Sequence, residues 1–391
     1  MTSEWNHSTI NDVCVLVTDG SHSSPKSVND GKYMVSVKDF TDYGFDFASC
    51  RMISNDDYET LKRNGCVPQM DDILIGKDGA RFFEDIIIYR QKEKPALLSS
   101  IAILRCDKSK ILPDFLYYVL RTPSFRQDVK DNYGSGSAIP RIILKDFKRM
   151  MVSYPSLEKQ QSIISVLTAI DSKIQANTEI NDNLADLLQT IYQDRFGNDI
   201  LAVNQGVLSD ICSYSRDKVA VSELNVSTYF STENMLSEKA GSTEATSLPT
   251  TSQTTACHKG DTLISNIRPY FKKIVYCEGN CGCSTDVLCF TPSQPRYSTY
   301  LFSTLYADKF FAFMVAGSKG TKMPRGDKQQ IMTYPVVLPS EEELAGFNTI
   351  ASPLLKQIYS NRAENKRLSI LRDTLLPKLM SGEIDVSAVQ L

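Results

Sequence analysis

Between residues 156 and 196, apolar residues recur at alternating intervals of four and three positions. The series comprises Ile163, Leu167, Ile170, Ile174, Asn177, Asn181, Leu184, Leu188 and Ile191, with two asparagines at its centre. This alternation is typical of the seam of a coiled-coil helix. We therefore predict a long helix over residues 158–196, with a polar interruption in an otherwise apolar seam.

The same series returns 184 residues later in the chain. Its members are Phe347, Ala351, Leu354, Ile358, Asn361, Asn365, Leu368, Arg372 and Leu375. Arg372 is the one departure, and we expect its neighbour Leu371 to supply the apolar side chain of the seam in its place. Each copy is preceded by a Pro-Ser pair and then glutamate, at Pro155 and Pro339, which is typical of a helix start. The pattern thus predicts a second helix over residues 339–380.

Each helix would contain about 36 residues and measure about 54 Å, at about 1.5 Å per residue. Neither helix alone could bury its seam, so we expect the two to pack on each other. An antiparallel pair fits best, because a globular segment of similar size precedes each helix. Asparagines that pair across the seam would cost stability but fix the register. The alternative is two helices whose polar centres face solvent.

The first globular segment, residues 1–154, reads as strands followed by a helix. Strand-like runs cover residues 13–17, 33–37, 72–75 and 99–104, and a helical pattern covers 113–133. Residues 198–338 repeat this order at 260–265, 284–290 and 300–311. The Ser- and Thr-rich stretch 231–256 has few apolar residues, so we expect an exposed loop there. The two halves predict one scaffold with divergent surfaces.

The clearest shared loop lies shortly before each long helix. Residues 134–141, Gly-Ser-Gly-Ser-Ala-Ile-Pro-Arg, align with residues 318–325, Ser-Lys-Gly-Thr-Lys-Met-Pro-Arg. Glycine lets backbone amides approach a ligand, hydroxyls donate hydrogen bonds, and arginine suits a phosphate or a guanine edge. The loop is therefore a candidate nucleic-acid contact, although a plain glycine-rich connection would look much the same.

Composition adds little about partners but indicates a compartment. The net charge of the 391 residues is −3, so the overall balance does not indicate a nucleic-acid binder. Ten scattered cysteines are typical of free thiols in a reducing cytoplasm. The N-terminal residues lack the features of a signal peptide, and no apolar run approaches the about 18 residues of a membrane helix. We expect a cytoplasmic protein that does not contact a membrane.

Nearly the whole chain resembles the DNA-specificity subunit of Type I restriction-modification systems. The resemblance rests on two variable globular segments, each followed by a long helix. It also rests on residues 19–25 (Asp-Gly-Ser-His-Ser-Ser-Pro), 157–161 (Leu-Glu-Lys-Gln-Gln) and 375–384 (Leu-Leu-Pro-Lys-Leu-Met-Ser-Gly-Glu-Ile). The sequence departs from the family at 341–344, where Glu-Glu-Glu-Leu replaces the Glu-Gln pattern, and the second half lacks the Asp-Gly-Ser-His loop.

The resemblance implies an α+β protein in which two long antiparallel coiled-coil helices separate two target-recognition domains, as a pseudo-twofold internal repeat. The expected parts are target-recognition domain 1 (1–154), a central spacer helix (155–197), target-recognition domain 2 (198–338), and a distal helix with the C-terminal tail (339–391). Helices of about 54 Å, at about 3.4 Å per base pair, would separate two half-sites by at most about 16 base pairs.

The resemblance further implies a non-catalytic reader of double-stranded DNA without a cofactor. Each domain would read one half of a bipartite target, and modification (methyltransferase) subunits, two copies being expected, would dock on the helices. Whether restriction (nuclease-translocase) subunits also join stays open. The candidate DNA contacts are Ser21, His22, Ser24, Lys26, Lys77, Arg81, Ser135, Ser137, Arg141, Asn266, Arg268, Tyr270, Lys272, Lys273, Lys319, Thr321, Lys322 and Arg325.

Two patterns that suggest a metal site are better explained otherwise. Cys277, Cys281, Cys283 and Cys289 lack the paired spacing of zinc knuckles, and buried free cysteines are common. Asp114 and Asp128 have the outline of a nuclease site but fall on a predicted helix. A metal-dependent endonuclease acting alone and a coiled-coil interaction protein without DNA binding remain the alternative functions.

Overall fold

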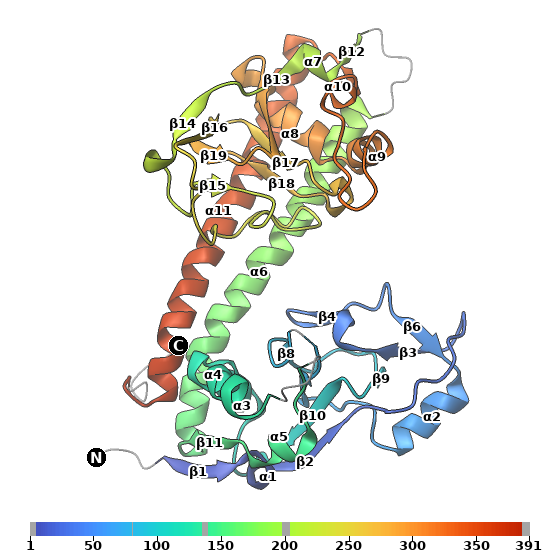
Figure 1. Cartoon of the computed structure of the whole chain (residues 1–391), viewed down its shortest axis with the longest axis vertical. Coiled ribbons are helices and arrows are strands. Elements are labelled where there is room, and N and C mark those ends of the chain that lie inside the picture. The colour runs from blue at the N-terminus through green and yellow to red at the C-terminus, as the bar shows by residue number, and fades with distance from the viewer. Residues whose placement is uncertain (1–4, 80, 135–139, 198–203, 385–391) are drawn as a thin grey trace. The chain divides into compact units, whose positions relative to one another are not determined.

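The computed structural model describes residues 5–79, 81–134, 140–197 and 204–384. The contacts divide the chain into two compact units, one formed by Met1–Ile174 with Lys366–Leu391 and the other by Gln175–Asn365. We call these unit 1 and unit 2. The two long helices, α6 (Leu157–Phe196) and α11 (Glu341–Met380), each contain 40 residues and contribute to both units (Figure 1). The division of the chain by role, into residues 1–154, 155–197, 198–338 and 339–391, stays a prediction.

The start of α11 is fixed by a reciprocal cap. The backbone N–H of Ser340 donates to the Glu343 carboxylate at 2.8 Å, and the Glu343 N–H donates to Ser340 Oγ at 3.3 Å. Hydrogen bonds from the backbone N–H and the side chain of Ser340 to the Glu343 carboxylate hold the pKa of Glu343 below its ordinary value. Such a capping box satisfies amides that have no partner inside the helix. The acid that caps the helix is Glu343. The sequence pattern pointed to Glu342, the residue before it.

The globular part of unit 1 is built on a four-stranded antiparallel sheet of order β2-β10-β7-β8. Its strands are Cys14–Asp19, Ile101–Cys106, Ile73–Gly76 and Ile86–Ile88. A smaller sheet has the order β6-β3-β9 (Arg51–Ile53, Lys32–Val35, Ala96–Leu97), and β4 (Phe40–Thr41) pairs with β5 (Gly44–Phe45). Beside α6, β1 (Asn6–Thr9) pairs with β11 (Met151–Tyr154). Three of the four strand-like runs of the sequence thus lie in the central sheet.

Unit 2 repeats the central sheet and the strand pair beside the long helix. Its four-stranded sheet has the order β13-β20-β17-β18 (Cys212–Tyr214, Val287–Pro292, Thr262–Ser265, Ile274–Tyr276). The second sheet is β14-β16-β19-β15 (Lys218–Ala220, Gln253–Cys257, Cys281–Cys283, Tyr229–Phe230), and β12 (Gln205–Val207) pairs with β21 (Pro335–Val337) before α11. The internal repeat that the sequence predicts is therefore also a repeat of strand order in the central sheet, whereas the smaller sheets differ in the number and order of their strands.

The predicted helix over residues 113–133 is two helices, which corrects that expectation. α3 (Pro113–Arg121) ends at Thr122, and α4 (Pro123–Asn132) begins directly after it. Thr122 adopts extended backbone angles, as the residue before a proline usually does, and its side chain then accepts the N–H of Phe125. The corresponding stretch of unit 2 is likewise split at Ala307, into α8 (Ser298–Tyr306) and α9 (Asp308–Ala316).

Shorter helices complete the two units. They are α1 (Ile10–Val13), α2 (Asn55–Arg63), α5 (Leu144–Arg149), α7 (Leu208–Ile211) and α10 (Lys328–Ile331), with 3-10 turns at Val37–Asp39, Val221–Glu223, Pro269–Phe271 and Pro295–Tyr297. Across the described ranges, no helix combines the length and apolar character that a membrane span requires.

In each unit, one core joins the globular part to both long helices. In unit 1, Ile163 and Leu167 of α6 and Leu379 of α11 lie in one buried cluster with α3 and the central sheet. In unit 2, Leu188 of α6 and Phe347 of α11 share a cluster with α8, α9 and the sheet. The seam of the helices is thus buried by the partner helix and by the globular part together. The α+β class with a pair of long antiparallel helices is confirmed.

The expected exposed loop at 231–256 is exposed only in part. Met235 is fully buried beside Cys257 and Leu263, and β16 begins at Gln253 within the same stretch. Asn234 is also buried, where its side chain donates to the carbonyls of Tyr229 and Thr243. Side-chain hydrogen bonds and one buried methionine therefore hold this polar segment in place.

Candidate nucleic-acid interface

The asparagines of the helix seam meet one another inside unit 2. Asn177 Nδ2 donates to Asn365 Oδ1 at 2.8 Å, and Asn361 Nδ2 donates to Asn181 Oδ1 at 2.9 Å. Asn177, Asn181 and Asn361 are buried. The residue numbers rise along α6 while they fall along α11, so these two layers define an antiparallel register.

The other helix-pairing candidates lie on the same seam. Ile163, Leu167, Ile170, Leu188, Phe347 and Ile358 are buried, whereas Ile174, Leu184, Leu354 and Leu368 are half-buried. Leu371, expected to cover for Arg372, is 47% exposed, which corrects that expectation. Arg372 itself lies in the seam of unit 1, where its guanidinium donates to Asp171 at 2.8 Å.

The Asp-Gly-Ser-His loop of unit 1 is organised by Asp19, a residue absent from the candidate list. Its carboxylate lies 3.3 Å from the His22 ring and 3.4 Å from Lys77 Nζ. Ser21 is buried, and its hydroxyl donates to the Ser23 carbonyl. Ser24 accepts a bond from the Arg51 guanidinium. His22 and Lys26 remain exposed, so this loop presents imidazole and ammonium groups to solvent.

Lys77 faces inward, unlike the other charged candidates of unit 1. Its side chain is only 8% exposed and lies near Asp19 and Asp78. An ammonium held in this way orders the loop around it, and direct contact with a DNA phosphate would require it to leave both carboxylates. Its backbone meanwhile ties neighbouring segments together, because the Ile142 N–H donates to the Lys77 carbonyl.

In unit 1 the loop between β7 and β8 is fastened to the Pro-Arg end of the shared loop. Asp78 forms a β-bridge with Arg141, and the Gly79 N–H donates to the Pro140 carbonyl at 2.9 Å. Arg81 and Arg141 are exposed around this junction. Ser135 and Ser137 lie outside the described residues.

Unit 2 has the same junction between the β17–β18 loop and the second Pro-Arg pair. Ile267 bridges Arg325, and the Arg268 N–H donates to the Pro324 carbonyl at 2.8 Å. Lys319 and Arg325 exchange backbone hydrogen bonds and thereby close a short loop that carries Thr321 and Lys322, both exposed. Each unit thus brings together two loops that lie far apart in the sequence, the hairpin loop and the Pro-Arg loop, which we call the paired loops. The sequence repeat indicates only the Pro-Arg loop of each pair.

Several basic candidates in unit 2 contact acids or carbonyls of their own unit. Lys272 lies 3.1 Å from Asp308, a bond that raises the pKa of Lys272 and helps to lower that of Asp308. Lys273 donates to the Thr232 carbonyl at 2.6 Å, and burial lowers its pKa. Lys319 pairs with Asp327, and Arg325 lies 3.0 Å from Asp286.

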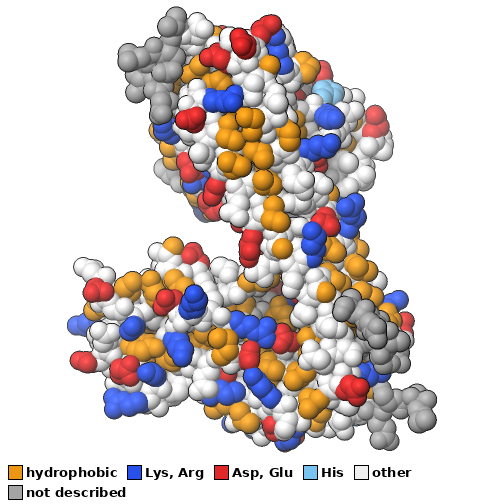
Figure 2. Space-filling model, turned by 180° about the vertical axis from the view of Figure 1, so that it is seen from behind, with side chains coloured by type: hydrophobic (Ala, Val, Ile, Leu, Met, Phe, Trp, Pro, Cys, Tyr) orange, Lys and Arg blue, Asp and Glu red, His pale blue; other side chains and the backbone are white. Residues whose placement is uncertain are grey.

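Asn266 and Arg268 each bury polar atoms at this junction. Among the described residues, neither Asn266 Oδ1 nor Arg268 Nε finds a hydrogen-bond partner. The Asn266 carbonyl accepts the Gly326 N–H, which places the asparagine against the Pro-Arg loop. Figure 2 shows Lys and Arg side chains lying among Asp and Glu side chains on one face of both units, as expected for a chain of net charge −3.

The residues that suggested metal sites are engaged otherwise. The Arg90 guanidinium binds both oxygens of Asp114, and Asp128 accepts a bond from Asn132. The Sγ atoms of Cys277 and Cys281 lie 3.5 Å apart in a buried cluster with Cys257, Cys283 and Cys289. Within the described ranges, no set of three or more His, Cys, Asp or Glu side chains is arranged to hold a metal ion.

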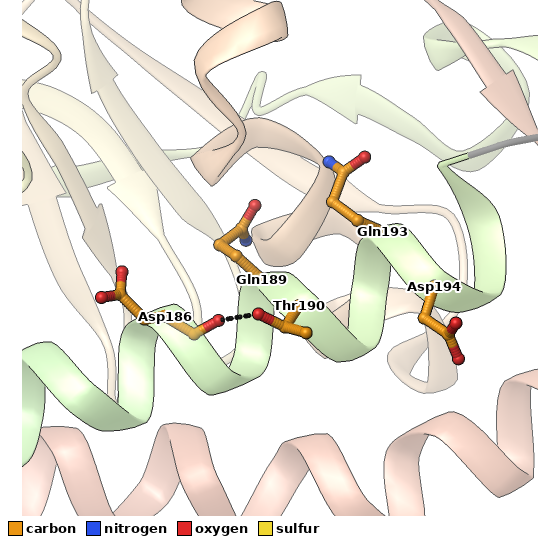
Figure 3. Close-up of a pocket in the computed structure, with 5 residues that line it drawn as sticks. All are labelled: Asp186, Gln189, Thr190, Gln193 and Asp194. Carbon is orange, nitrogen blue, oxygen red and sulfur yellow. Dashed lines mark hydrogen bonds between the residues drawn. The ribbon is translucent and has the colours of Figure 1, made fainter.

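An open hollow of about 620 Å³ lies along α6 in unit 2 and is lined by Asp186, Gln189, Thr190, Gln193 and Asp194 (Figure 3). Thr190 donates to the Asp186 carbonyl, and Gln189 donates to the Ser303 carbonyl of α8. Its lining contains two carboxylates and no basic side chain. The hollow is therefore unsuited to DNA phosphates, which leaves the paired loops as the candidate interface.

Comparisons with known proteins agree with this architecture. Residues 2–185 match the family described as the Type I restriction modification DNA specificity domain. The chain is 23% identical over 339 residues, 71% of either protein, to the specificity subunit of the Type I restriction enzyme MjaIX from Methanocaldococcus jannaschii. It is 26% identical over 123 residues, 30% of this chain and 26% of the other, to that of the HindI enzyme from Haemophilus influenzae.

A solved structure extends the likeness of fold to the whole chain. The crystal structure of the S subunit of a Type I restriction-modification system from M. genitalium superposes with a TM-score of 0.56 at 16% identity. The superposition covers 97% of this chain and 96% of the other. Residues 2–185 thus match a Type I restriction modification DNA specificity domain in sequence, and the chain as a whole has the fold of a solved S subunit.

Proposed function

We propose that this protein reads a bipartite DNA sequence with the paired loops of its two units and itself carries out no chemistry. The observation that carries the proposal is the repeated junction of hairpin loop and Pro-Arg loop, once in each unit. A repeat of the reading surface suits a target with two half-sites. The candidate contacts on these loops are hydroxyl, amide and basic groups, which bind phosphates and base edges.

The long helices would act as the spacer and as the docking surface for two modification subunits. Six large apolar side chains on them stay exposed, between 37% and 58%: Leu157, Ile180, Leu187, Ile350, Ile370 and Leu371. Exposed apolar side chains on a helix pair favour a protein partner. The ten free cysteines accord with the reducing cytoplasm in which such a complex would work.

The function is tested by selection from a random DNA library, with the chain purified together with its modification subunits. Two short sequence blocks separated by a fixed gap are the expected result. A single block would mean that one unit does not read DNA. The absence of any enrichment would contradict the proposal and favour an interaction protein. Incubation of the chain alone with plasmid DNA and magnesium is expected to leave the DNA uncut, whereas cleavage abolished by Asp128→Ala would support the nuclease alternative.

The docking surface is tested by replacing exposed apolar side chains of α6 with glutamate and measuring co-purification of the modification subunits. Ile180→Glu with Leu187→Glu is expected to abolish co-purification of the modification subunits. Val15→Glu, which changes a side chain 66% exposed away from the long helices, is the matched control and should leave co-purification unchanged. Equal loss in both variants would mean that added negative charge, and not this helix face, determines binding.

A further inference from the structure

The β7–β8 loop of unit 1 and the β17–β18 loop of unit 2 share a pattern of backbone hydrogen bonds. In unit 1 the Phe82 N–H donates to the Gly79 carbonyl at 3.0 Å, and in unit 2 the Phe271 N–H donates to the Arg268 carbonyl at 3.0 Å. Each bond closes a four-residue turn, and each turn begins at the residue whose N–H is bonded to the Pro-Arg loop. Arg81 and Tyr270 therefore occupy the same position, the third residue of the turn.

Left-handed backbone angles strengthen this correspondence. Gly79 has φ +95° and Phe83 φ +62°, while Arg268 and Lys272 both have φ +51°. In each loop the two left-handed residues are four positions apart and enclose the turn. Three of the four carry a side chain, and each such residue costs about 1–2 kcal/mol in this conformation. Two loops that share only a phenylalanine, Phe82 and Phe271, thus keep left-handed residues at the same spacing.

In each unit the side chain at the third position of the turn is exposed. The Arg81 side chain is 73% exposed, and Tyr270 is 47% exposed. Phe83 and Pro269 are buried, and the ammonium groups of Lys272 and Lys273 contact Asp308 and the Thr232 carbonyl. Two loops that keep the same backbone hydrogen bonds while their outermost side chain differs are suited to reading sequence, because the base contact can change while the docking geometry stays constant.

We propose that Arg81 and Tyr270 are corresponding specificity-determining residues, each reading a base pair in its own half-site. This inference rests on the proposed function and assigns base readout within it. The guanidinium of Arg81 matches the O6 and N7 acceptors of guanine. The Arg81 side chain also contacts Asp85 and Glu84. Ion pairs of an exposed side chain are weak, so a contact with a base can replace them. The Tyr270 ring offers an apolar face to a thymine methyl group or an unstacked base.

The test compares DNA libraries selected by wild-type, Arg81→Ala and Tyr270→Ala complexes with the modification subunits. Arg81→Ala is expected to relax one G·C position in one block and leave the other block unchanged. Tyr270→Ala should relax one position in the other block. Each should weaken binding to the wild-type target by roughly 5- to 150-fold, the range of one base contact.

The matched control is Lys259→Ala, which removes an exposed charge from unit 2 outside the two loops and outside the candidate contacts. It should leave the preferred sequence unchanged at every position. Should an alanine variant fold poorly, Arg81→Lys and Tyr270→Phe keep the loop and test the same positions by altered preference. If the wild-type complex selects two sequence blocks and neither substitution changes them, this inference is overturned and the proposed function stands. A wild-type complex that selects no sequence would overturn both.

Discussion

In unit 1, the guanidinium of Arg372 lies 2.8 Å from the carboxylate of Asp171 and joins the two long helices by an ion pair, where the sequence repeat has leucine in the other copy. Both side chains are only 19% exposed. The Tyr118 hydroxyl donates to the second carboxylate oxygen of Asp171 at 2.7 Å, so the globular part takes part in the same polar contact. The departure from the apolar pattern is thus compensated by a specific partner.

Removal of one member of this pair should cost more than removal of both. Arg372→Leu leaves a half-buried carboxylate without its cation, and we expect the unfolding free energy of unit 1 to fall by about 2 kcal/mol. Asp171→Leu combined with Arg372→Leu should recover most of that loss, because no unpaired charge remains. Urea unfolding followed through Trp5 checks this, since the single tryptophan packs on the unit 1 core. A double variant as unstable as the sum of the single variants would contradict the coupling.

The asparagine layers predict a difference between two double variants of equal composition. Asn181→Leu with Asn361→Leu replaces one complete layer by apolar side chains. Asn177→Leu with Asn361→Leu breaks both layers and leaves Asn181 facing leucine. We expect the first variant to be more stable by about 1–3 kcal/mol, the cost of an unsatisfied buried amide. Thermal unfolding followed by circular dichroism distinguishes them, and equal midpoints would mean that the amide pairs carry no stability.

Asp261 of unit 2 should make stability depend on pH. Burial raises the pKa of this carboxyl above the ordinary 3.8, with partial compensation from the His258 N–H at 2.7 Å. The folded chain therefore holds the proton more tightly than the unfolded chain does. Stability should accordingly fall as the pH rises from 3.8 through the raised pKa.

Asp261→Asn should flatten this dependence and raise the stability at neutral pH, measured by urea unfolding between pH 4 and 8. Asp72 occupies the corresponding place in unit 1, before β7, but binds Arg105 through two bonds of 2.8 Å. Asp72→Asn is thus the contrasting control and should destabilise unit 1 at neutral pH. Parallel pH profiles for the wild type and Asp261→Asn would show that Asp261 does not titrate differently on folding.

The exposed and buried basic residues should differ in the salt dependence of DNA binding. Arg141→Ala and Lys322→Ala are each expected to lower the slope of log affinity against log salt by about 0.9, the value for one phosphate contact. Lys77→Met should leave the slope unchanged, because the Lys77 ammonium lies between Asp19 and Asp78. Fluorescence anisotropy over a range of salt concentrations measures all three. A slope lowered by Lys77→Met would place its ammonium on DNA.

The sequence by itself determined the elements whose signal is local. The alternation of four and three residues defines α6 and α11, because a helix presents a recurring face regardless of its partner. The repeat at an offset of 184 likewise indicated two copies of one scaffold, and strand order confirms it. The break at Thr122 and Pro123 was missed in the prediction of one helix over 113–133, although its signal is local, since proline restricts the residue before it.

Only the tertiary structure decided which side chains face one another. Periodicity places Asn177 and Asn181 on a seam, but the antiparallel register decides that they meet Asn365 and Asn361. Lys77 reads as a surface cation until Asp19, from another strand, comes within 3.4 Å. The correspondence of Arg81 and Tyr270 is visible only from the backbone hydrogen bonds that join their loops to the distant Pro-Arg loops. Such relationships depend on contacts between residues far apart in the chain, and no local pattern records them.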